Sequence, residues 1–180
     1  MKYLICLILL ISATANASFM IEPFAGMNFN GQFQADGASD KDNFSGTMYG
    51  ARAGIERMGF MIGMDARIGN WTIDDDNDSE LSTTSYGFFA GYNFPMLLRV
   101  WGTYVFAGDG TVEDSGDFLK GSGFILGIGY KVLPFVSLNF ETGNLKFAEF
   151  ETEAGVNDSG RSDEATYYLL SVSVPLSIGL

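Results

Sequence analysis

The sequence predicts an all-β protein, an eight-stranded antiparallel up-and-down transmembrane β-barrel. Eight segments alternate between apolar and mixed residues with a period of two, which is typical of strands. Short and long connections also alternate along the chain, as in membrane barrels whose tight turns share one end. Finally, the 180 residues include 23 Gly, 16 Phe, 8 Tyr and 2 Trp. This composition suits strands that bend, pack closely and display aromatic rings.

The first 17 residues have the pattern of a secretory signal peptide. Lys2 precedes a short apolar run, and Ala15-Asn16-Ala17 has the Ala-x-Ala form of a cleavage site. The run is too short to cross a bilayer as a helix, which needs about 20 residues. We therefore expect a signal peptide over residues 1–17 and one barrel domain over residues 18–180. The single cysteine, Cys6, lies in the signal, so we expect no disulfide in the mature chain.

The eight predicted strands fill most of the mature chain. They cover residues 19–29, 49–56, 60–69, 85–93, 98–106, 123–131, 136–143 and 168–180. Short turns are expected near residues 57–59, 94–96 and 132–134. Long loops are expected at residues 31–46, 70–81, 107–118 and 148–165. Pro23 and Pro175 lie on the first and last strands, which must close the barrel. Because proline cannot donate to a strand ladder, we expect each at a bulge or at the rim.

The charges on the strands indicate which face is inside. The apolar faces carry no charge and include small residues that would fill a protein core poorly, namely Ala25, Ala51, Ala53, Ala66, Ala90 and Gly102. Lipid accepts such a surface, and balanced charges can pair inside a narrow interior. We therefore expect the apolar faces outside and an interior cluster of ion pairs. It comprises the charged residues of the mixed faces, Glu22, Arg52, Glu56, Asp65, Arg67, Arg99, Lys131 and Glu141.

Bulky side chains are expected to share the interior with these charges. An eight-stranded barrel has an interior just wide enough for side chains to fill. We therefore expect a plugged barrel. The inward glycines leave some room, so a narrow porin-like channel for small or hydrophobic solutes is the alternative function. The bulky residues with inward parity are Phe24, Phe89, Trp101, Ile125 and Leu169.

Aromatic residues are placed near both ends of the predicted strands. Two rings of aromatics around an aliphatic band are typical of the interfacial girdles of outer-membrane barrels. Those near the short turns are Phe19, Phe60, Tyr92, Phe94 and Tyr130. Those near the long loops are Phe29, Tyr49, Tyr86, Tyr104, Phe106 and Tyr168.

With these features the sequence resembles the small eight-stranded outer-membrane barrels of the opacity, OmpX and OmpA-barrel group. The likeness is carried by Gly-Ile-Gly-Tyr at 127–130, Val-Ser-Leu-Asn-Phe-Glu at 136–141 and the terminal Val-Ser-Val-Pro-Leu-Ser-Ile-Gly-Leu. The resemblance implies export to the outer membrane of a diderm bacterium. It also implies outer-membrane lipid, lipopolysaccharide and the outer-membrane assembly machinery as partners. The last residue in that family is usually Phe and serves as an assembly signal, whereas this chain has Leu180.

No catalytic residue and no cofactor are predicted. The chain has no histidine, so it cannot build a Ser-His-Asp triad. Neither His nor Cys is left in the mature chain to bind zinc. Carboxylates such as Glu22 and Glu56 are expected to form ion pairs rather than to transfer protons. The net charge of -12 argues against nucleic acid as a partner, because neutralising phosphates needs clustered Lys and Arg.

Most of the acidic residues fall in the predicted long loops. These loops hold 18 of the 22 acids, and only Lys41 and Arg161 oppose them there. A field of one sign attracts divalent cations or cationic ligands. We therefore predict a structural or surface-interaction protein that displays acidic extracellular loops.

The densest acidic stretch has the sequence TIDDDNDSE. In it, Asp74, Asp76 and Asp78 have the spacing that opens a calcium loop of the EF-hand type. However, Ser79 replaces the glycine of the sixth position, and Ser85 replaces the glutamate of the twelfth. We therefore expect no dedicated EF-hand. The three aspartates are a weak candidate for binding calcium or magnesium, including as a bridge to lipopolysaccharide phosphates.

Overall fold

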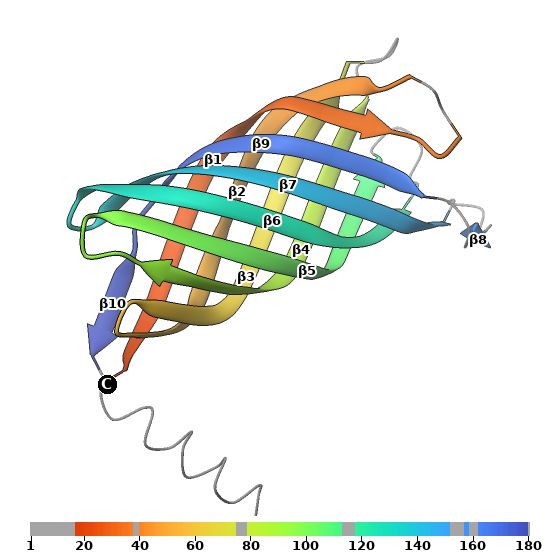
Figure 1. Ribbon diagram of the computed structural model, residues 1–180. Helices are drawn as coiled ribbons and strands as arrows, with labels where there is room; N and C mark the ends of the chain where they lie inside the picture. Colours follow the sequence, from red (N-terminus) through yellow and green to blue (C-terminus); the bar gives the residue numbers. More distant parts are fainter. Residues whose placement is uncertain are drawn as a thin grey trace, which may run out of the picture.

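The chain forms a closed barrel in which each strand pairs antiparallel with its neighbours (Figure 1). The computed structural model describes residues 17–37, 40–74, 79–112, 118–151, 157–158 and 162–179. Among these residues no helix has the length and apolarity to cross a membrane. The predicted fold class is confirmed. The predicted signal peptide lies outside the described residues apart from Ala17.

Eight strands make the wall, and the eighth is interrupted. β1 pairs with β2 on one side and with β9 and β10 on the other, which closes the barrel. The two-residue strand β8 (Asn157–Asp158) pairs only with the end of β7. The wall consists of β1 (Ser18–Gln34), β2 (Asp42–Arg57), β3 (Phe60–Ile73), β4 (Glu80–Asn93), β5 (Leu98–Val112), β6 (Phe118–Leu133), β7 (Val136–Glu151), β9 (Asp163–Ser173) and β10 (Leu176–Gly179).

Short turns join the strands at one end of the barrel, as predicted. Met58 and Gly59 connect β2 to β3, and both have positive φ, 50° and 86°. Two such residues form a tight hairpin whose twist matches that of the flanking strands, and glycine adopts this conformation without strain. The turn between β4 and β5 also contains a positive φ, 67° at Leu97. Pro134 and Phe135 join β6 to β7.

At the other end the strands extend well beyond their predicted limits. β1 continues to Gln34 and β2 begins at Asp42, within the first predicted long loop. β3 continues to Ile73 and β4 begins at Glu80, so the two strands occupy half of the second predicted long loop. These extensions alternate like the rest of the strands, but their outward residues are polar. The pattern of one apolar face therefore predicts strand ends that fall several residues too early.

The seam between β1 and β9–β10 contains both predicted prolines. The ladder is interrupted opposite Pro23, between β9 and β10, yet the pairs on either side of the gap follow one register. Val174 N–H donates to Pro23 O at 3.0 Å, and Pro23 has no N–H to return the second bond of this pair. Neither proline lies at a bulge, and both lie inside the seam rather than at the rim, so the prediction of a bulge or rim position is wrong. They remove hydrogen bonds from the ladder and leave the alignment of the strands unchanged.

A ring of outward-facing residues divides the barrel into two parts. We call the strand residues from this ring to the short turns the turn half, and the strand residues beyond it the loop half. The ring itself belongs to the turn half. It consists of Phe29, Tyr49, Ile68, Tyr86, Phe106, Phe124, Thr142 and Tyr168.

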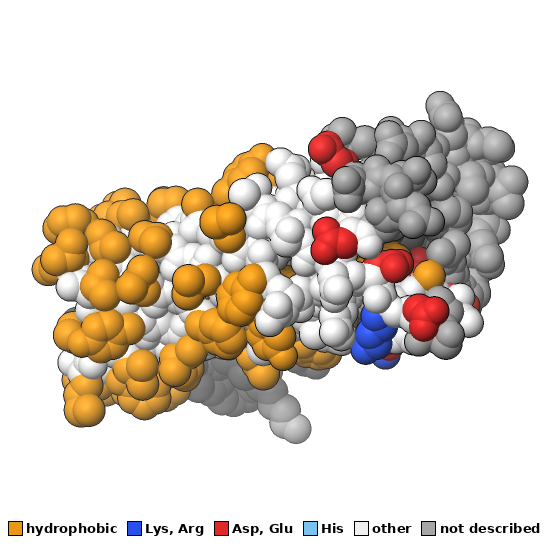
Figure 2. Space-filling view, turned by 90° about the horizontal axis from the view of Figure 1, so that it is seen from above, with side chains coloured by type: hydrophobic (Ala, Val, Ile, Leu, Met, Phe, Trp, Pro, Cys, Tyr) orange, Lys and Arg blue, Asp and Glu red, His pale blue; other side chains and the backbone are white. Residues whose placement is uncertain are grey.

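The outer surface of the turn half is apolar. Ile62 is 65% exposed and Leu126 is 63% exposed, and they belong to a belt of outward aliphatic and aromatic side chains (Figure 2). Aromatic pairs lie at both edges of the belt. The Phe60 and Tyr92 rings are 4.8 Å apart near the short turns, and the Tyr104 and Phe124 rings are 5.0 Å apart near the ring. The prediction that the apolar faces point outward is confirmed by this exposure.

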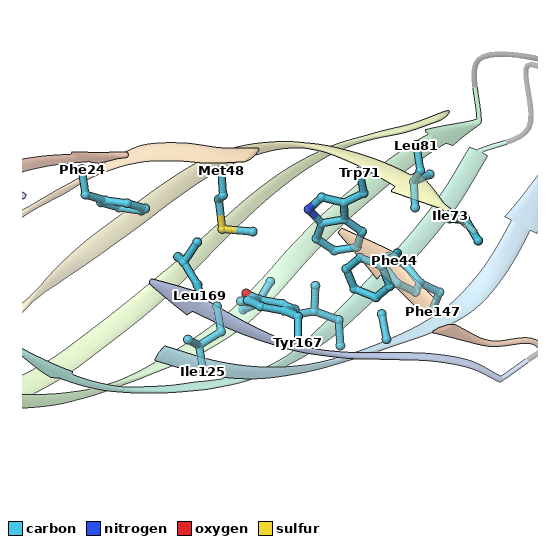
Figure 3. Packing of buried hydrophobic residues seen from close by; sticks show 13 residues of the cluster. Phe24, Phe44, Met48, Trp71, Ile73, Leu81, Ile125, Phe147, Tyr167 and Leu169 are labelled. Atoms are coloured by element: carbon cyan, nitrogen blue, oxygen red, sulfur yellow. The ribbon is translucent and has the colours of Figure 1, made fainter. Parts of the chain in front are cut away.

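In the loop half the same alternation carries the opposite chemistry. Large apolar side chains point inward and pack together (Figure 3). The Trp71 ring stacks on Phe44 with 4.6 Å between centroids and lies 5.7 Å from Tyr167. The inward set is Phe44, Met48, Trp71, Ile73, Leu81, Leu145, Phe147, Ala165 and Tyr167. Exposed or half-buried polar residues face outward, among them Asn43, Ser45, Thr47, Asn70, Thr72, Ser82, Thr84, Asn144 and Thr166.

Candidate functional site

Six of the eight charged residues predicted for the interior meet inside the turn half. Each of them is at most 2% exposed. Their strands are widely separated around the wall, so contacts among them cross the interior of the barrel. They are Glu22 from β1, Arg52 from β2, Asp65 and Arg67 from β3, Arg99 from β5 and Glu141 from β7.

Arg52 lies at the centre of this charged network and contacts all three acids. Its Nη1 is 3.3 Å from Glu22 Oε1, its Nε is 3.1 Å from Asp65 Oδ2, and its Nη2 is 2.5 Å from Glu141 Oε1. The planar guanidinium makes such multiple contacts possible, because it presents five N–H donors in a fixed geometry. Since β2 and β7 are not neighbours in the wall, the contact with Glu141 links opposite parts of the barrel.

The other two arginines complete the charge balance. Arg67 donates to both Asp65 oxygens at 2.8 and 2.7 Å, and its Nη1 donates to Glu141 Oε2 at 2.6 Å. Arg99 donates from Nη1 and Nη2 to the two Glu22 oxygens at 2.7 and 2.5 Å. Paired N–H···O bonds of this kind are the strong form of arginine–carboxylate contact. With three arginines and three carboxylates, the network has no net charge.

Aromatic rings and glycines surround the arginines. The Arg52 guanidinium carbon lies 4.3 Å from the Trp101 ring centroid and 4.8 Å from that of Phe24, within range of cation–π attraction. Gly127 pairs with Trp101 across the ladder, and Gly143 pairs with Tyr167. A Cβ added at either glycine would overlap the partner's ring. The space beside Gly127 and Gly143 is therefore filled by the ring of the residue opposite each.

The described interior is packed in both halves. Trp71 and Tyr167 in the loop half and Phe89, Arg52 and Arg99 in the turn half are all less than 2% exposed. All five bulky residues predicted to point inward are buried, at 0–4% exposure: Phe24, Phe89, Trp101, Ile125 and Leu169. The geometry serves to hold the wall together, because every carboxylate of the network is paired with arginine.

Glu56 and Lys131 lie apart from the charged network. Both face the short-turn end, where they line a shallow pocket of about 350 Å³. Asn93 Nδ2 donates to Glu56 Oε1 at 2.9 Å, and Ser177 Oγ donates to its other oxygen at 3.4 Å. They are separate because they stand close to the short turns, where the interior opens to water. The cluster of eight expected from parity thus comprises six residues and a separate pair.

The acidic residues of the predicted loops are only partly described. Asp74 is exposed, and its backbone N–H donates to Asn43 O at 2.8 Å. The other two candidate metal ligands, Asp76 and Asp78, lie outside the described residues. Within the part of the chain that the structure describes, no three His, Cys, Asp or Glu residues are grouped as metal ligands.

Two features of the long-loop end differ from what the sequence predicts. Asp163 is not an exposed loop residue: it is 1% exposed on β9, and its Oδ1 accepts a hydrogen bond from Asp36 N–H at 2.8 Å. In addition, Lys120 and Lys146 join Lys41 among the cations of this end, because β6 and β7 continue into the loop half. The predicted strands end before these residues, because the apolar alternation does not extend to them.

Comparison with known proteins gives matches among solved structures. No family model matches the sequence, and no curated protein does. Neisserial surface protein A (NspA) matches with a TM-score of 0.58 and 13% identity over 88% of this chain and 97% of that one. Ail, the attachment invasion locus protein of Yersinia pestis, matches with a TM-score of 0.54 and 12% identity over 90% and 99%. Ail has also been solved in complex with the heparin analogue sucrose octasulfate (TM-score 0.50, 10% identity, 89% and 99% covered).

The fold and the two surfaces define the class of protein. The chain has the fold of small eight-stranded outer-membrane barrels. A closed barrel has no unpaired edge strand, as lipid requires, and its apolar belt provides the lipid-facing surface. The chain therefore has the fold and the lipid-facing belt of an integral outer-membrane β-barrel, and this belt covers the turn half.

Proposed function

We propose that the protein has a structural and surface-interaction role, in which the barrel holds acidic loops above the outer membrane. The observation that carries this proposal is the chemistry of the loop half. Its apolar interior and polar exterior are those of a water-soluble barrel, so it forms a rigid extension that stands in water. Short turns of membrane barrels lie in the periplasm, so the loop half points out of the cell.

The charges of this end indicate the chemistry of a partner. Described acidic side chains are exposed on several strands and connections of the loop half, namely Asp36, Asp40, Asp42, Asp74, Glu80 and Asp109. Such a surface favours polycationic ligands and divalent cations and repels polyanions. An acidic surface of this kind does not suit the ligand of the solved Ail complex, which is the sulfated heparin analogue sucrose octasulfate.

The packed interior supports this role over a channel. The charged network and the apolar cluster together fill the described interior of both halves. A display function needs a rigid barrel, whereas solute passage needs a continuous opening. The same packing, and the absence of histidine from the sequence, supports a non-enzymatic role.

A binding experiment with charged probes tests the proposal. The folded barrel is reconstituted in neutral lipid vesicles, and vesicles with their loops outside are mixed with polylysine or with sucrose octasulfate. We expect polylysine to bind, sucrose octasulfate not to bind, and millimolar Mg²⁺ or raised salt to weaken the polylysine complex. Neutralising Asp36, Asp40, Asp42, Asp74 and Glu80 to the amides should weaken it further.

A matched control separates loop charge from total charge. Glu56→Gln removes one acid at the periplasmic end and should leave polylysine binding unchanged. Equal binding of polylysine by the five-fold variant and the unmodified barrel would contradict the proposed role of the acidic loops.

A further inference from the structure

A pocket of about 350 Å³ lies at the short-turn end of the barrel. Its apolar rim is formed by the turn between β2 and β3 and the turn between β4 and β5, through Met58, Phe94 and Leu97. Met58 is 85% exposed and Leu97 is 50% exposed, so this rim is open to a ligand. Beside the rim stand two side chains of opposite charge, Glu56 near the end of β2 and Lys131 near the end of β6. The pocket therefore combines an acid, a base and an apolar surface.

The two charges do not neutralise each other. Both residues are half-buried, and among the described residues the Lys131 ammonium has neither an ion pair nor a hydrogen bond. The described donors to Glu56 are neutral, namely Asn93 Nδ2 at 2.9 Å and Ser177 Oγ at 3.4 Å. Arg99 attracts Glu56 from deeper in the barrel, but its two terminal nitrogens already donate to another carboxylate. Both charges are therefore available to a ligand that carries the opposite ones.

Buried polar atoms next to these charges lack partners. Asn93 Oδ1 and Ser137 Oγ are both buried and have no hydrogen bond among the described residues, and folded proteins leave few such atoms unpaired. Ser137 is opposite Lys131 in the β6–β7 ladder and therefore shares its face of the wall. The register shifts just beyond this pair, which leaves Val132 as an extra residue in β6, and a bulge of this kind re-aims the side chains beside it. The lining of the pocket can thus form more hydrogen bonds than the described protein groups supply.

We propose that this pocket binds a short zwitterionic peptide, with the peptide ammonium at Glu56 and its carboxylate at Lys131. Charge-assisted hydrogen bonds of this kind are roughly twice as strong as neutral ones. An apolar side chain of the peptide would pack on Met58 and Leu97. A ligand of one charge sign would match only one of the two groups, and a volume near the lower end of ligand pockets suits a dipeptide. The site lies at the end opposite the acidic loops, so the inference goes beyond the display role. With the short turns in the periplasm, the peptide would come from that compartment.

The test is a calorimetric titration of the folded full-length barrel with the dipeptide alanyl-leucine. The barrel is held in an uncharged maltoside detergent, because a zwitterionic detergent would compete for the pocket. We expect alanyl-leucine to bind about tenfold more tightly than either its C-terminal amide or its N-acetylated form, since each cap removes one charge-assisted contact. Gel mobility with and without boiling shows whether the protein is folded.

Two variants assign each charge of the peptide to its partner. Lys131→Gln should bind alanyl-leucine about tenfold more weakly and bind the free and amidated forms equally, while it still prefers the free form over the acetylated one. Glu56→Gln should show the converse. Lys41→Gln and Glu80→Gln make the same changes of charge at the long-loop end and should bind as the unmodified barrel does. The caps and variants together form a cycle that a general loss of stability cannot reproduce.

The inference would be overturned by no binding of alanyl-leucine to the folded unmodified barrel, by equal affinity for the free and capped forms, or by an equal loss in the loop-end controls. Free leucine bound as tightly as the dipeptide would overturn the peptide assignment in favour of an amino acid. These results are independent of the proposed function. A barrel that binds polylysine but not alanyl-leucine would keep the display role and lose the pocket, and the opposite pattern would do the reverse.

Discussion

The turn half and the loop half use one strand alternation for two opposite purposes. On β3 of the turn half, inward Asp65 is buried among arginines and outward Met64 is 44% exposed. Further along the same strand, inward Trp71 is 2% exposed in an apolar cluster and outward Thr72 is exposed. The backbone geometry and parity are the same in both halves. The surroundings of the wall, lipid or water, therefore decide which chemistry goes inside.

The two halves also differ in what holds them together. In lipid, apolar burial inside the barrel would bring little gain, since the exterior is already in an apolar medium. There the turn half is held by charge-assisted hydrogen bonds that cross the interior. In the proposed arrangement the loop half stands in water, where removing apolar surface from solvent contributes roughly 25 cal/mol per Å². Substitutions at matched positions should separate these two sources of stability.

The largest effect is expected from Arg52→Ala in the charged network. This change leaves Glu22, Asp65 and Glu141 with too few buried partners, and breaking a buried ion pair costs about 3–5 kcal/mol. Urea unfolding of the barrel in vesicles, followed by tryptophan fluorescence, measures the loss. Arg52→Lys keeps the charge but cannot reach all three carboxylates, so we expect an intermediate loss. A loss below about 1 kcal/mol for Arg52→Ala would show that the network does not hold the turn half together.

A similar loss is expected from Phe147→Ala in the loop half. Phe147 is 2% exposed, and truncating a buried Phe costs about 3–5 kcal/mol. Phe140 on the same strand provides the matched control, because it is 41% exposed on the lipid-facing side. Phe140→Ala should cost only about 1 kcal/mol, through lost ring contacts such as that with Tyr168. Equal losses in the two variants would contradict the division into halves.

A charge placed on the outer wall should destabilise the turn half and leave the stability of the loop half almost unchanged. Met64→Arg puts a charge on the lipid-facing belt and should cost about 2–4 kcal/mol near the middle of the bilayer. Thr72→Arg puts the same charge on the same face of the same strand, but in the loop half. We expect almost no change in the free energy of unfolding there. The two variants are compared in vesicles by the same urea titration.

The smallest effect is expected where a glycine faces a large ring. Gly143→Ala would overlap the Tyr167 ring, and overpacking of this kind costs about 1–3 kcal/mol. Gly102→Ala is the control, because the nearest atom to its added Cβ is Leu126 Cδ2 at 3.4 Å. The unfolding free energy of the Gly102 variant should stay near that of the unmodified barrel. If Gly143→Ala were equally harmless, the inward glycines would be leaving space in the interior after all.

The barrel could be predicted from sequence because parity is a local property. The alternation of a few neighbouring residues is enough to predict that Arg52 faces inward and Ile62 faces outward. The partners of Arg52 could not be predicted, since its contact with Glu141 depends on how β2 and β7 are staggered across the closed wall. The loop half was missed for a different reason. Outward Asn70 and Thr72 resemble loop residues, and the inward Trp71 and Ile73 that alternate with them are too few to mark a strand.

The most direct test of the account is to locate the boundary between lipid and water along β3. Single cysteines are introduced at the outward positions with Cys6 replaced, and each carries a nitroxide label in the vesicle-reconstituted barrel. Collision with oxygen reports lipid, and collision with a water-soluble nickel chelate reports water. The positions are Ile62, Met64, Ala66, Ile68, Asn70 and Thr72. We predict lipid exposure up to Ile68 and water exposure from Asn70 onward. Lipid exposure that continues through Thr72, or water exposure at Met64, would contradict the division of the barrel into two halves.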